Sequence, residues 1–187
     1  MNELVTVAVV VPCNNVAHIV NQCIKSLIQQ DYPQDKFSII AVNDGSTDKT
    51  KEHLEVFKPH PNFYLFDHEK NKGLSATRNT GIKNSQSEIV CFLDSDMVVQ
   101  PDWLQLIVAE FVAEEVIGVI GDTTLPKGED PNILDHYFYS AKRGARQFEE
   151  NSAIGWRWFL FNNTAVKRSA IKKTGLFDTI FTSYGGE

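Results

Sequence analysis

Two aspartates stand directly after an apolar run, and their spacing suits metal binding. The run occupies residues 89–93 and is followed by Asp94-Ser95-Asp96. Carboxylates are costly to desolvate unless a cation meets them, and residues i and i+2 of an extended segment point to the same side. Asp94 and Asp96 could therefore hold one hard divalent ion, Mg²⁺ or Mn²⁺, together with substrate phosphates. A turn or helix cap closed by Asp-Ser-Asp is the alternative interpretation, because both residue types are common in turns.

Two other apolar runs also end in polar residues. The first run is followed by Pro12-Cys13-Asn14-Asn15, and the second by Asn43-Asp44-Gly45-Ser46-Thr47-Asp48. In a parallel α/β sheet, ligands bind outside the carboxyl ends of the strands. Each ending alone is equally compatible with a turn and a helix N-cap. Three such endings on one edge of a sheet favour a binding site.

The common phosphate-binding loops are missing from the sequence. There is no G-x-G-x-x-G after the first strand and no G-x-x-x-x-G-K-[ST] anywhere, which argues against a Rossmann dinucleotide site and a P-loop. A divalent ion is then the expected means of neutralising a diphosphate. The five histidines show no ligand spacing, and we expect them on the surface or on helix faces.

Strand-like and helix-like segments alternate along the chain, which predicts an α/β fold with a mainly parallel sheet covered by helices. Strands are expected at 4–11, 37–42, 63–66, 89–93 and 116–120. Helices are expected from residue 19 to the Tyr32-Pro33 stop and at 47–57, 75–83, 101–114, 133–147 and 167–173, with an apolar aromatic segment at 156–161.

Length and composition indicate one globular domain. The chain has 187 residues, of which 42% are hydrophobic and 22% charged, and its net charge of -6 argues against a general nucleic-acid binder. Cys13, Cys23 and Cys91 are odd in number and lack C-x-x-C spacing, so we expect buried thiols in a reducing compartment. No membrane-length apolar stretch or secretion signal is visible. We therefore expect a cytoplasmic protein.

The polar strand ends and the residues that follow the third strand form an ordered set of motifs. This set resembles that of glycosyltransferase family 2, and the order and spacing match over nearly the whole chain. The final residues, 184–187, are similar to the acceptor-side Gly-Gly-Glu-Asp segment of that family. The motifs are Val9-Val10-Val11-Pro12-Cys13-Asn14-Asn15, Val42-Asn43-Asp44-Gly45-Ser46-Thr47-Asp48, Asn71-Lys72-Gly73-Leu74-Ser75-Ala76-Thr77-Arg78-Asn79-Thr80-Gly81-Ile82, Phe92-Leu93-Asp94-Ser95-Asp96 and Gly175-Leu176-Phe177-Asp178.

The resemblance implies a GT-A fold, a nucleotide-diphosphate sugar donor, Mn²⁺ or Mg²⁺, and inversion at the anomeric carbon. Residues 1–100 would form the nucleotide and metal half of one domain, and 101–187 the acceptor half, with segment 137–157 as the acceptor-facing wall. The donor is expected to be a UDP-sugar, and the acceptor a saccharide, a lipid-linked glycan or a protein.

The family motifs also imply roles for individual residues. These roles are binding of the nucleoside, recognition of the base, contact with the rest of the nucleotide, and metal binding by the two aspartates of a DXD motif. Pro12 and Asn14 would border the nucleoside, Asp44 would accept a hydrogen bond from uracil, Arg78 would lie near the nucleotide, Asp94 would contact the ribose or the metal, and Asp96 would be the principal metal ligand. Asn14, Cys13 and Asn43 depart from the tyrosine, threonine and aspartate common in the family. These departures concern the stacking contact and the base preference.

The catalytic base is expected at the end of the chain. In the family it is the aspartate after the glutamate of Glu-Asp, so it would follow Glu187, with Glu187 itself as the second candidate. We accordingly expect the natural protein to continue past residue 187, with membrane association only through that further part. Two alternatives remain open at this point: a sugar-nucleotide-binding module without catalysis, and a related nucleotidyltransferase, which would call for a glycine- and lysine-rich loop after the first strand.

Overall fold

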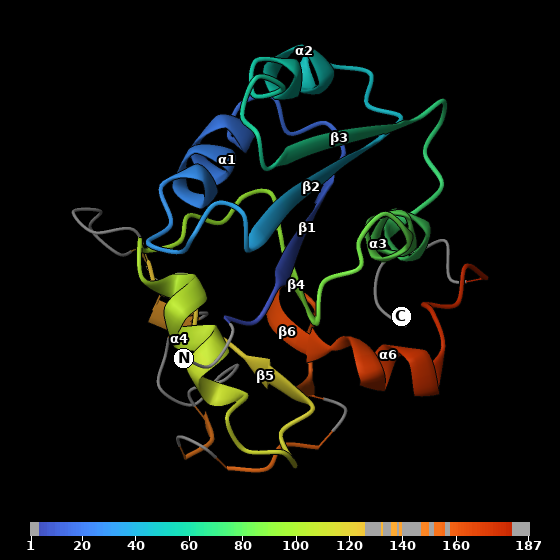
Figure 1. Ribbon diagram of the computed structural model, residues 1–187. Helices are drawn as coiled ribbons and strands as arrows, with labels where there is room; N and C mark the ends of the chain where they lie inside the picture. The colour runs from blue at the N-terminus through green and yellow to red at the C-terminus, as the bar shows by residue number, and fades with distance from the viewer. Residues whose placement is uncertain are drawn as a thin grey trace.

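A six-stranded sheet forms the centre of the computed structural model, which describes residues 4–125, 132, 136–137, 139, 147–149, 152–155 and 158–180. The strand order is β3-β2-β1-β4-β6-β5 (Figure 1). Strands β1 to β4 run parallel, and β6 is antiparallel to both β4 and β5. The strands are β1 (Val7–Cys13), β2 (Phe37–Asp44), β3 (Phe63–His68), β4 (Ile89–Leu93), β5 (Gly118–Ile120) and β6 (Asn163–Lys167).

Helices cover both faces of the sheet (Figure 1). One face carries α1 (Val20–Ile28), α2 (Thr50–Glu55) and α4 (Trp103–Glu110), and the other carries α3 (Leu74–Lys83) and α6 (Arg168–Thr174). No helix among the described residues is long and apolar enough to cross a membrane.

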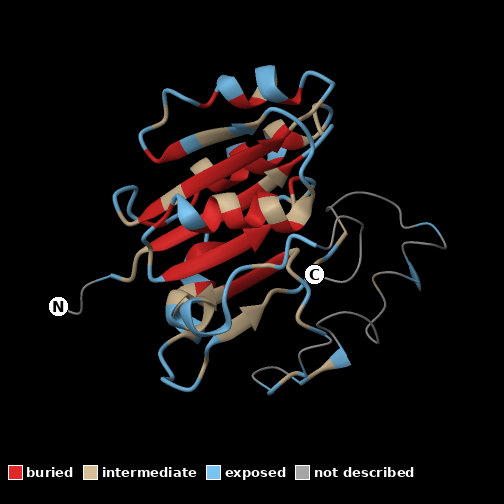
Figure 2. Cartoon of the chain, turned by 90° about the vertical axis from the view of Figure 1, so that its right-hand side faces the viewer, coloured by how far each residue is buried: buried red, intermediate tan, exposed pale blue. Residues whose placement is uncertain are grey.

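Strand β1 lies in the middle of the core because it is apolar on both faces. All five residues from Val7 to Val11 are fully buried. Val7, Val9 and Val11 pack with the cluster under α1, α2 and α4, whereas Val10 packs with Ile82 of α3 on the opposite face. Figure 2 shows the consequence: the central strands are buried along their length, and exposed residues are confined to the outer surfaces and loops. This is the pattern of a sheet sandwiched between helices.

The predicted α/β architecture with a mainly parallel sheet is confirmed, and the predicted first four strands lie where they were expected within a few residues. The first strand was expected to begin at Leu4, but that residue is 49% exposed and β1 begins at Val7. Much of the helix predicted at 133–147 falls outside the described residues. The three cysteines are free and buried, as predicted.

Strand β6 was not predicted. Its sequence, Asn163 to Lys167, is mostly polar or small and lacks the apolar alternation of a strand. Pairing decides its conformation, since it lies between β4 and β5 and Ala165 is fully buried there. The side chain of Asn163 also accepts a hydrogen bond from the indole N–H of Trp103 in α4, at 3.1 Å. A tertiary environment of this kind overrides local propensity.

The close approach of α3 to β1 depends on Gly81. A Cβ at this position would lie 2.3 Å from the side chain of Val10. Alanine ordinarily stabilises a helix by about 0.5–1 kcal/mol over glycine, but here the added methyl would overpack the core, which typically costs about 1–3 kcal/mol. We expect G81A to lower the free energy of unfolding in urea.

The variant V10A provides the matched control. Because it removes the two methyl groups of Val10 that lie nearest to the added carbon, at 2.3 and 2.7 Å, G81A should cost less in the V10A background than in the parent. A stabilising effect of G81A in the parent chain would contradict this packing.

Candidate functional site

The polar segments that follow β1, β2 and β4 lie together at the carboxyl ends of these neighbouring strands. Strand β1 lies between β2 and β4, so the segments after Cys13, Asp44 and Leu93 are neighbours. Asn14 is exposed at the end of β1, and its side-chain N–H donates to the backbone oxygen of Asp44 at 2.7 Å. Pro12 is half-buried just before it. The predicted nucleoside-binding residues of the first two motifs are therefore in contact or adjacent.

Hydrogen bonds connect the loop after β1 to the loop after β2, and we call this set, formed by Asn15 and Ala17 with residues 46–48, the loop clasp. Asn15 has a left-handed φ of 55°. Its side-chain oxygen accepts from the backbone N–H of Thr47 at 2.8 Å, and its own N–H donates to the hydroxyl of Ser46 at 3.0 Å. Two residues further on, Ala17 donates its N–H to the carboxylate of Asp48 at 3.1 Å. The conformation of the two loops is thus fixed by hydrogen bonds between their own side chains and backbone.

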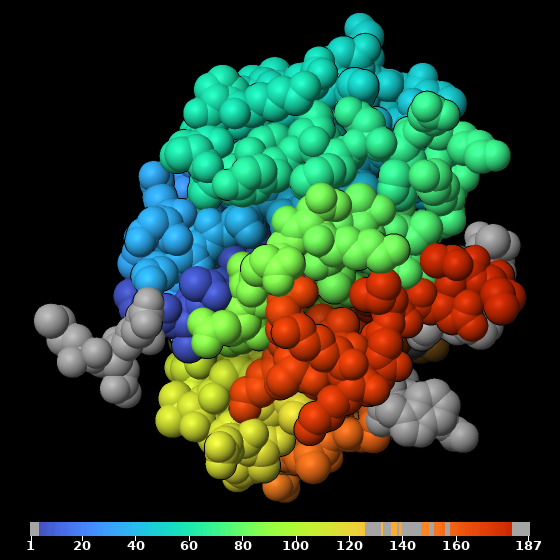
Figure 3. Space-filling model, turned by 45° about the vertical axis from the view of Figure 1, so that its right-hand side comes forward, coloured from blue at the N-terminus to red at the C-terminus, as the bar shows by residue number. Residues whose placement is uncertain are grey.

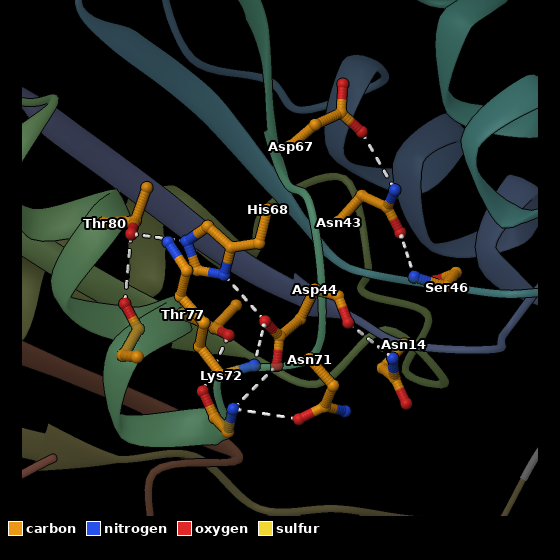
Figure 4. A network of polar contacts seen from close by, with 12 residues as sticks. Asn14, Asn43, Asp44, Ser46, Asp67, His68, Asn71, Lys72, Thr77 and Thr80 are labelled. Atoms are coloured by element: carbon orange, nitrogen blue, oxygen red, sulfur yellow. Dashed lines mark hydrogen bonds and ion pairs between the residues drawn. The ribbon is translucent and has the colours of Figure 1, made fainter.

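Asp44 has more protein partners than the motif alone suggests (Figure 4). Its carboxylate is buried and accepts from the backbone N–H groups of Lys72 at 2.9 Å and Gly73 at 3.0 Å. Gly73 is the N-cap of α3, so the carboxylate lies at the positive end of that helix. Asp44 therefore anchors the loop before α3, and its predicted contact with a base stays a prediction.

His68 is the residue that the sequence analysis missed. Histidines were expected on the surface or on helix faces, but His68 ends β3 and its side chain is only 7% exposed. Its Nδ1 lies 2.6 Å from Oδ1 of Asp44, and its Nε2 lies 2.9 Å from the hydroxyl of Thr80 (Figure 4). The sequence contained a sign of this position, because residues 67–68 directly follow the third predicted strand, as the other polar segments follow theirs.

Asp94 and Asp96 lie in the turn that leaves β4. The N–H of Asp94 donates to the backbone oxygen of Asn162 at 2.9 Å, and the oxygen of Asp94 accepts from Met97 at 3.1 Å. Asp94 is half-buried, Ser95 is buried and Asp96 is exposed. The turn interpretation is confirmed, and the turn places both carboxylates at the carboxyl end of β4. Metal binding by Asp94 and Asp96 stays a prediction.

Both carboxylates act on the same buried thiol. Burial raises the pKa of Cys23, in α1, to about 12, with further contributions from the negative charges of Asp96 and Asp94. The Cys23 thiol also lies 3.8 Å from the backbone oxygen of Asp94. Asp94 and Asp96 thus both lie within electrostatic reach of Cys23. Their convergence on one metal ion stays a prediction.

The donor set fits a hard divalent cation that completes its coordination with water and phosphate oxygens. Oxygen ligands from one or two carboxylates are typical of such Mg²⁺ sites. Among the described residues, no cluster of three or more His, Cys, Asp or Glu side chains could form an all-protein cage. Asp94 and Asp96 provide the oxygen ligands that a divalent ion bound together with substrate phosphates takes.

Arg78 has a supporting position in α3. Its guanidinium is buried, donates from Nη2 to the backbone oxygen of Phe161 at 2.9 Å, and lies 5.4 Å from the ring centroid of Phe177. The residue after Phe161 is Asn162, whose oxygen holds the N–H of Asp94. Arg78 is thereby linked to the carboxylate turn through two consecutive backbone carbonyls. Its predicted place near a nucleotide stays a prediction.

The segment from 158 to 180 returns to this part of the molecule. Figure 3 shows it lying against α3 on the surface, although the contacting residues Asn79 and Phe177 are 98 positions apart in the sequence. Asn79 of α3 and Phe177 exchange two hydrogen bonds, of 2.8 and 2.9 Å. Glu187 and most of the predicted acceptor wall at 137–157 lie outside the described residues. Their predicted roles are untested by this geometry.

The chain matches the family model described as "Glycosyl transferase family 2" over residues 8–175. This match spans most of its length, and the chain belongs to glycosyl transferase family 2. Among curated proteins, the glycosyltransferase GlyG of Streptococcus pneumoniae is 31% identical over 195 aligned residues, covering 99% of this chain and 62% of that protein.

Two solved structures show the same fold. The S. aureus protein TarS (residues 1–349), in complex with UDP, is similar with a TM-score of 0.74 and 23% identity, over 96% of this chain and 52% of that one. The mannosyltransferase PcManGT from Pyrobaculum calidifontis, in complex with GDP-Man and Mn²⁺, gives a TM-score of 0.74 and 24% identity, over 95% of this chain and 49% of that one. The fold is GT-A, as the motifs implied. The chain spans half to six-tenths of the length of these three proteins.

The role of Asp44 as an anchor can be tested by D44N. The amide places an N–H₂ group among donors that need an acceptor, and a hydrogen bond to a charged group is worth about 1.5–3 kcal/mol. The free energy of unfolding should fall by that amount. D67N is the matched control. Asp67 of β3 is paired with Lys51 at the surface, where such pairs contribute about 0–1 kcal/mol, and an amide oxygen at this position can still accept the hydrogen bond from Asn43. Equal losses for the two variants would argue against the anchor.

Proposed function

We propose that the chain is the donor-binding part of an inverting, metal-dependent glycosyltransferase that moves a sugar from a nucleotide diphosphate to an acceptor hydroxyl. The observation that carries this proposal is the meeting of Asn14, Asp44, Asp94 and Asp96 at the carboxyl edge of a GT-A sheet. Family membership and the nucleotide or nucleotide-sugar complexes of TarS and PcManGT support it.

The nucleoside would lie along the ends of β1 and β2, bordered by Pro12 and Asn14. The loop clasp would hold the ends of β1 and β2 in their binding conformation before the donor arrives. This lowers the entropy that the two loops lose on binding. Because an asparagine rather than an aromatic residue occupies position 14, the contact with the base would be polar. Asp44 is proposed to accept a hydrogen bond from a uracil N–H, in which case D44N would lose more affinity for UDP than for GDP.

The diphosphate would lie beside Asp94 and Asp96. These two carboxylates would hold Mg²⁺ or Mn²⁺, which stabilises the negative charge of the diphosphate leaving group as a Lewis acid. Asp96 is the more exposed and would provide the principal ligand, whereas the turn bonds of Asp94 would fix the position of the pair. Arg78 would support the position of Asp94 indirectly, because it binds the backbone oxygen of Phe161, and the next residue, Asn162, binds the N–H of Asp94.

The acceptor hydroxyl needs a base on the face of the sugar opposite the leaving group. We assign this function to the region of Glu187, with Glu187 or the aspartate that follows the corresponding glutamate in the family as the candidates. The acceptor would lie on the half formed by residues 101–187. A hexose or N-acetylhexosamine carried by UDP is the proposed donor, and the enzyme would act in the cytoplasm.

The variant D96A tests the proposed donor site. Loss of the principal ligand should weaken UDP binding in the presence of Mn²⁺ by at least about a hundredfold, beyond the roughly 10–100-fold that outer-shell changes cost at metal sites. Calorimetric titration of UDP, with and without the metal, measures this effect.

D35A is the matched control, because Asp35 is an exposed aspartate in the loop before β2, at the opposite edge of the sheet. Thermal unfolding should be alike in both variants and the parent. Unchanged affinity in D96A with Mn²⁺ present would overturn the assignment of the metal site.

A further inference from the structure

A buried histidine lies behind Asp44, outside the motifs that carry the family resemblance. His68 connects three elements, since it ends β3, contacts Asp44 at the end of β2, and contacts Thr80 in α3 (Figure 4). The side chains of His68 and Asp44 are 7% and 5% exposed. A titratable pair with so little access to water is costly to bury unless each member satisfies the other.

The hydrogen-bond partners define which protons the ring can carry. An ionised carboxylate only accepts, so Nδ1 of His68 must donate to Asp44. Thr80 has one hydroxyl hydrogen and two neighbours that could accept it: Nε2 of His68 at 2.9 Å and the backbone oxygen of Ala76 at 3.0 Å. When the hydroxyl donates to Ala76, Nε2 must carry a proton and the ring is cationic. When the hydroxyl turns to Nε2, the ring is neutral with its hydrogen on Nδ1.

Both states keep the bond from His68 to Asp44, so a change of protonation changes the charge and leaves the contacts in place. The pair is neutral overall when the ring is cationic and carries one negative charge when the ring is neutral. The same carboxylate holds the N–H groups of Lys72 and Gly73. The loop it anchors is in tight contact with the loop after β2, because a Cβ on Gly45 would lie 2.3 Å from the backbone of Lys70.

We propose that His68 is a positioning residue of the donor site that acts through Asp44, and that its protonated form strengthens the binding of the nucleoside diphosphate. The inference rests on the proposed function. The nucleotide carries negative charge, and a neutral Asp44–His68 pair repels it less than an anionic pair does.

The other charged groups near His68 do not replace this effect. Asp67, its neighbour on β3, is paired with Lys51 of α2 at 3.2 Å. From α3, the residue that faces the ring is the uncharged Thr80. The remaining charged residues are directed elsewhere or exposed in the following loop: Arg78, whose guanidinium donates to Phe161, and Glu69, Lys70 and Lys72.

The experiment compares the parent with H68Q, which keeps a side-chain N–H donor but cannot become cationic. UDP affinity with Mg²⁺ is measured by calorimetry over the range in which histidines ordinarily titrate, about pH 5 to 8. At the acidic end the parent should bind about tenfold more tightly than H68Q, which is the order of magnitude expected for one unit charge acting through the protein at an effective dielectric constant of about 20. This advantage should disappear as the pH rises.

H53Q makes the same chemical change at a histidine that contacts Asn21 between α2 and α1, and it should keep the parent's pH profile. If H68Q does not fold, the ring resonances of His68 in the parent decide the matter, because linkage requires UDP to move their titration to higher pH. Identical pH profiles for parent and H68Q, or a titration that UDP leaves unmoved, would overturn this proposal alone. Absence of UDP binding by the parent at every pH would overturn the proposed function as well.

Discussion

The buried carboxylate of Asp44 is the interaction on which the shape of the functional edge depends. It accepts from two backbone N–H groups at the start of α3 and from His68, while the backbone oxygen of the same residue holds Asn14. One residue, through its side chain and its backbone oxygen, thus ties together the ends of β1, β2 and β3 and the start of a helix. An anion at a helix N-terminus is stabilised by the N–H groups it meets. Burial makes the arrangement demanding, because each missing donor would leave a charge uncompensated.

The apolar sheet makes this edge possible. Val7 to Val11 are buried on both faces of β1, so β1 occupies the centre of the sheet and places the polar segments of β2 and β4 on either side of its own. The carboxylate turn of Asp94 and Asp96 then follows β4 on one side, and the Asp44 network follows β2 on the other. Polar loops can remain at this edge because packing within the sheet and its covering helices supplies the stability.

The sequence allowed the central strands and the carboxylates at their ends to be predicted, because both depend on local patterns. Runs such as residues 89–93 are apolar throughout, and Asp94 and Asp96 interrupt that run abruptly. Strand β6 could not be predicted, since Asn163 to Lys167 becomes a strand only through its pairing with β4 and β5. His68 was missed for a related reason. Its burial follows from Asp44 and Thr80, which are 24 and 12 residues away in the sequence.

The central claim is that the carboxyl edge of this sheet binds a nucleotide diphosphate through a metal held by Asp94 and Asp96. The most direct test is a crystal structure of the protein with UDP and Mn²⁺, with anomalous scattering used to locate the ion. We expect one manganese peak in contact with Asp96 and the diphosphate, and the nucleoside beside Pro12 and Asn14. A nucleotide bound elsewhere on the molecule, or bound at this edge with no metal between it and the two carboxylates, would contradict it.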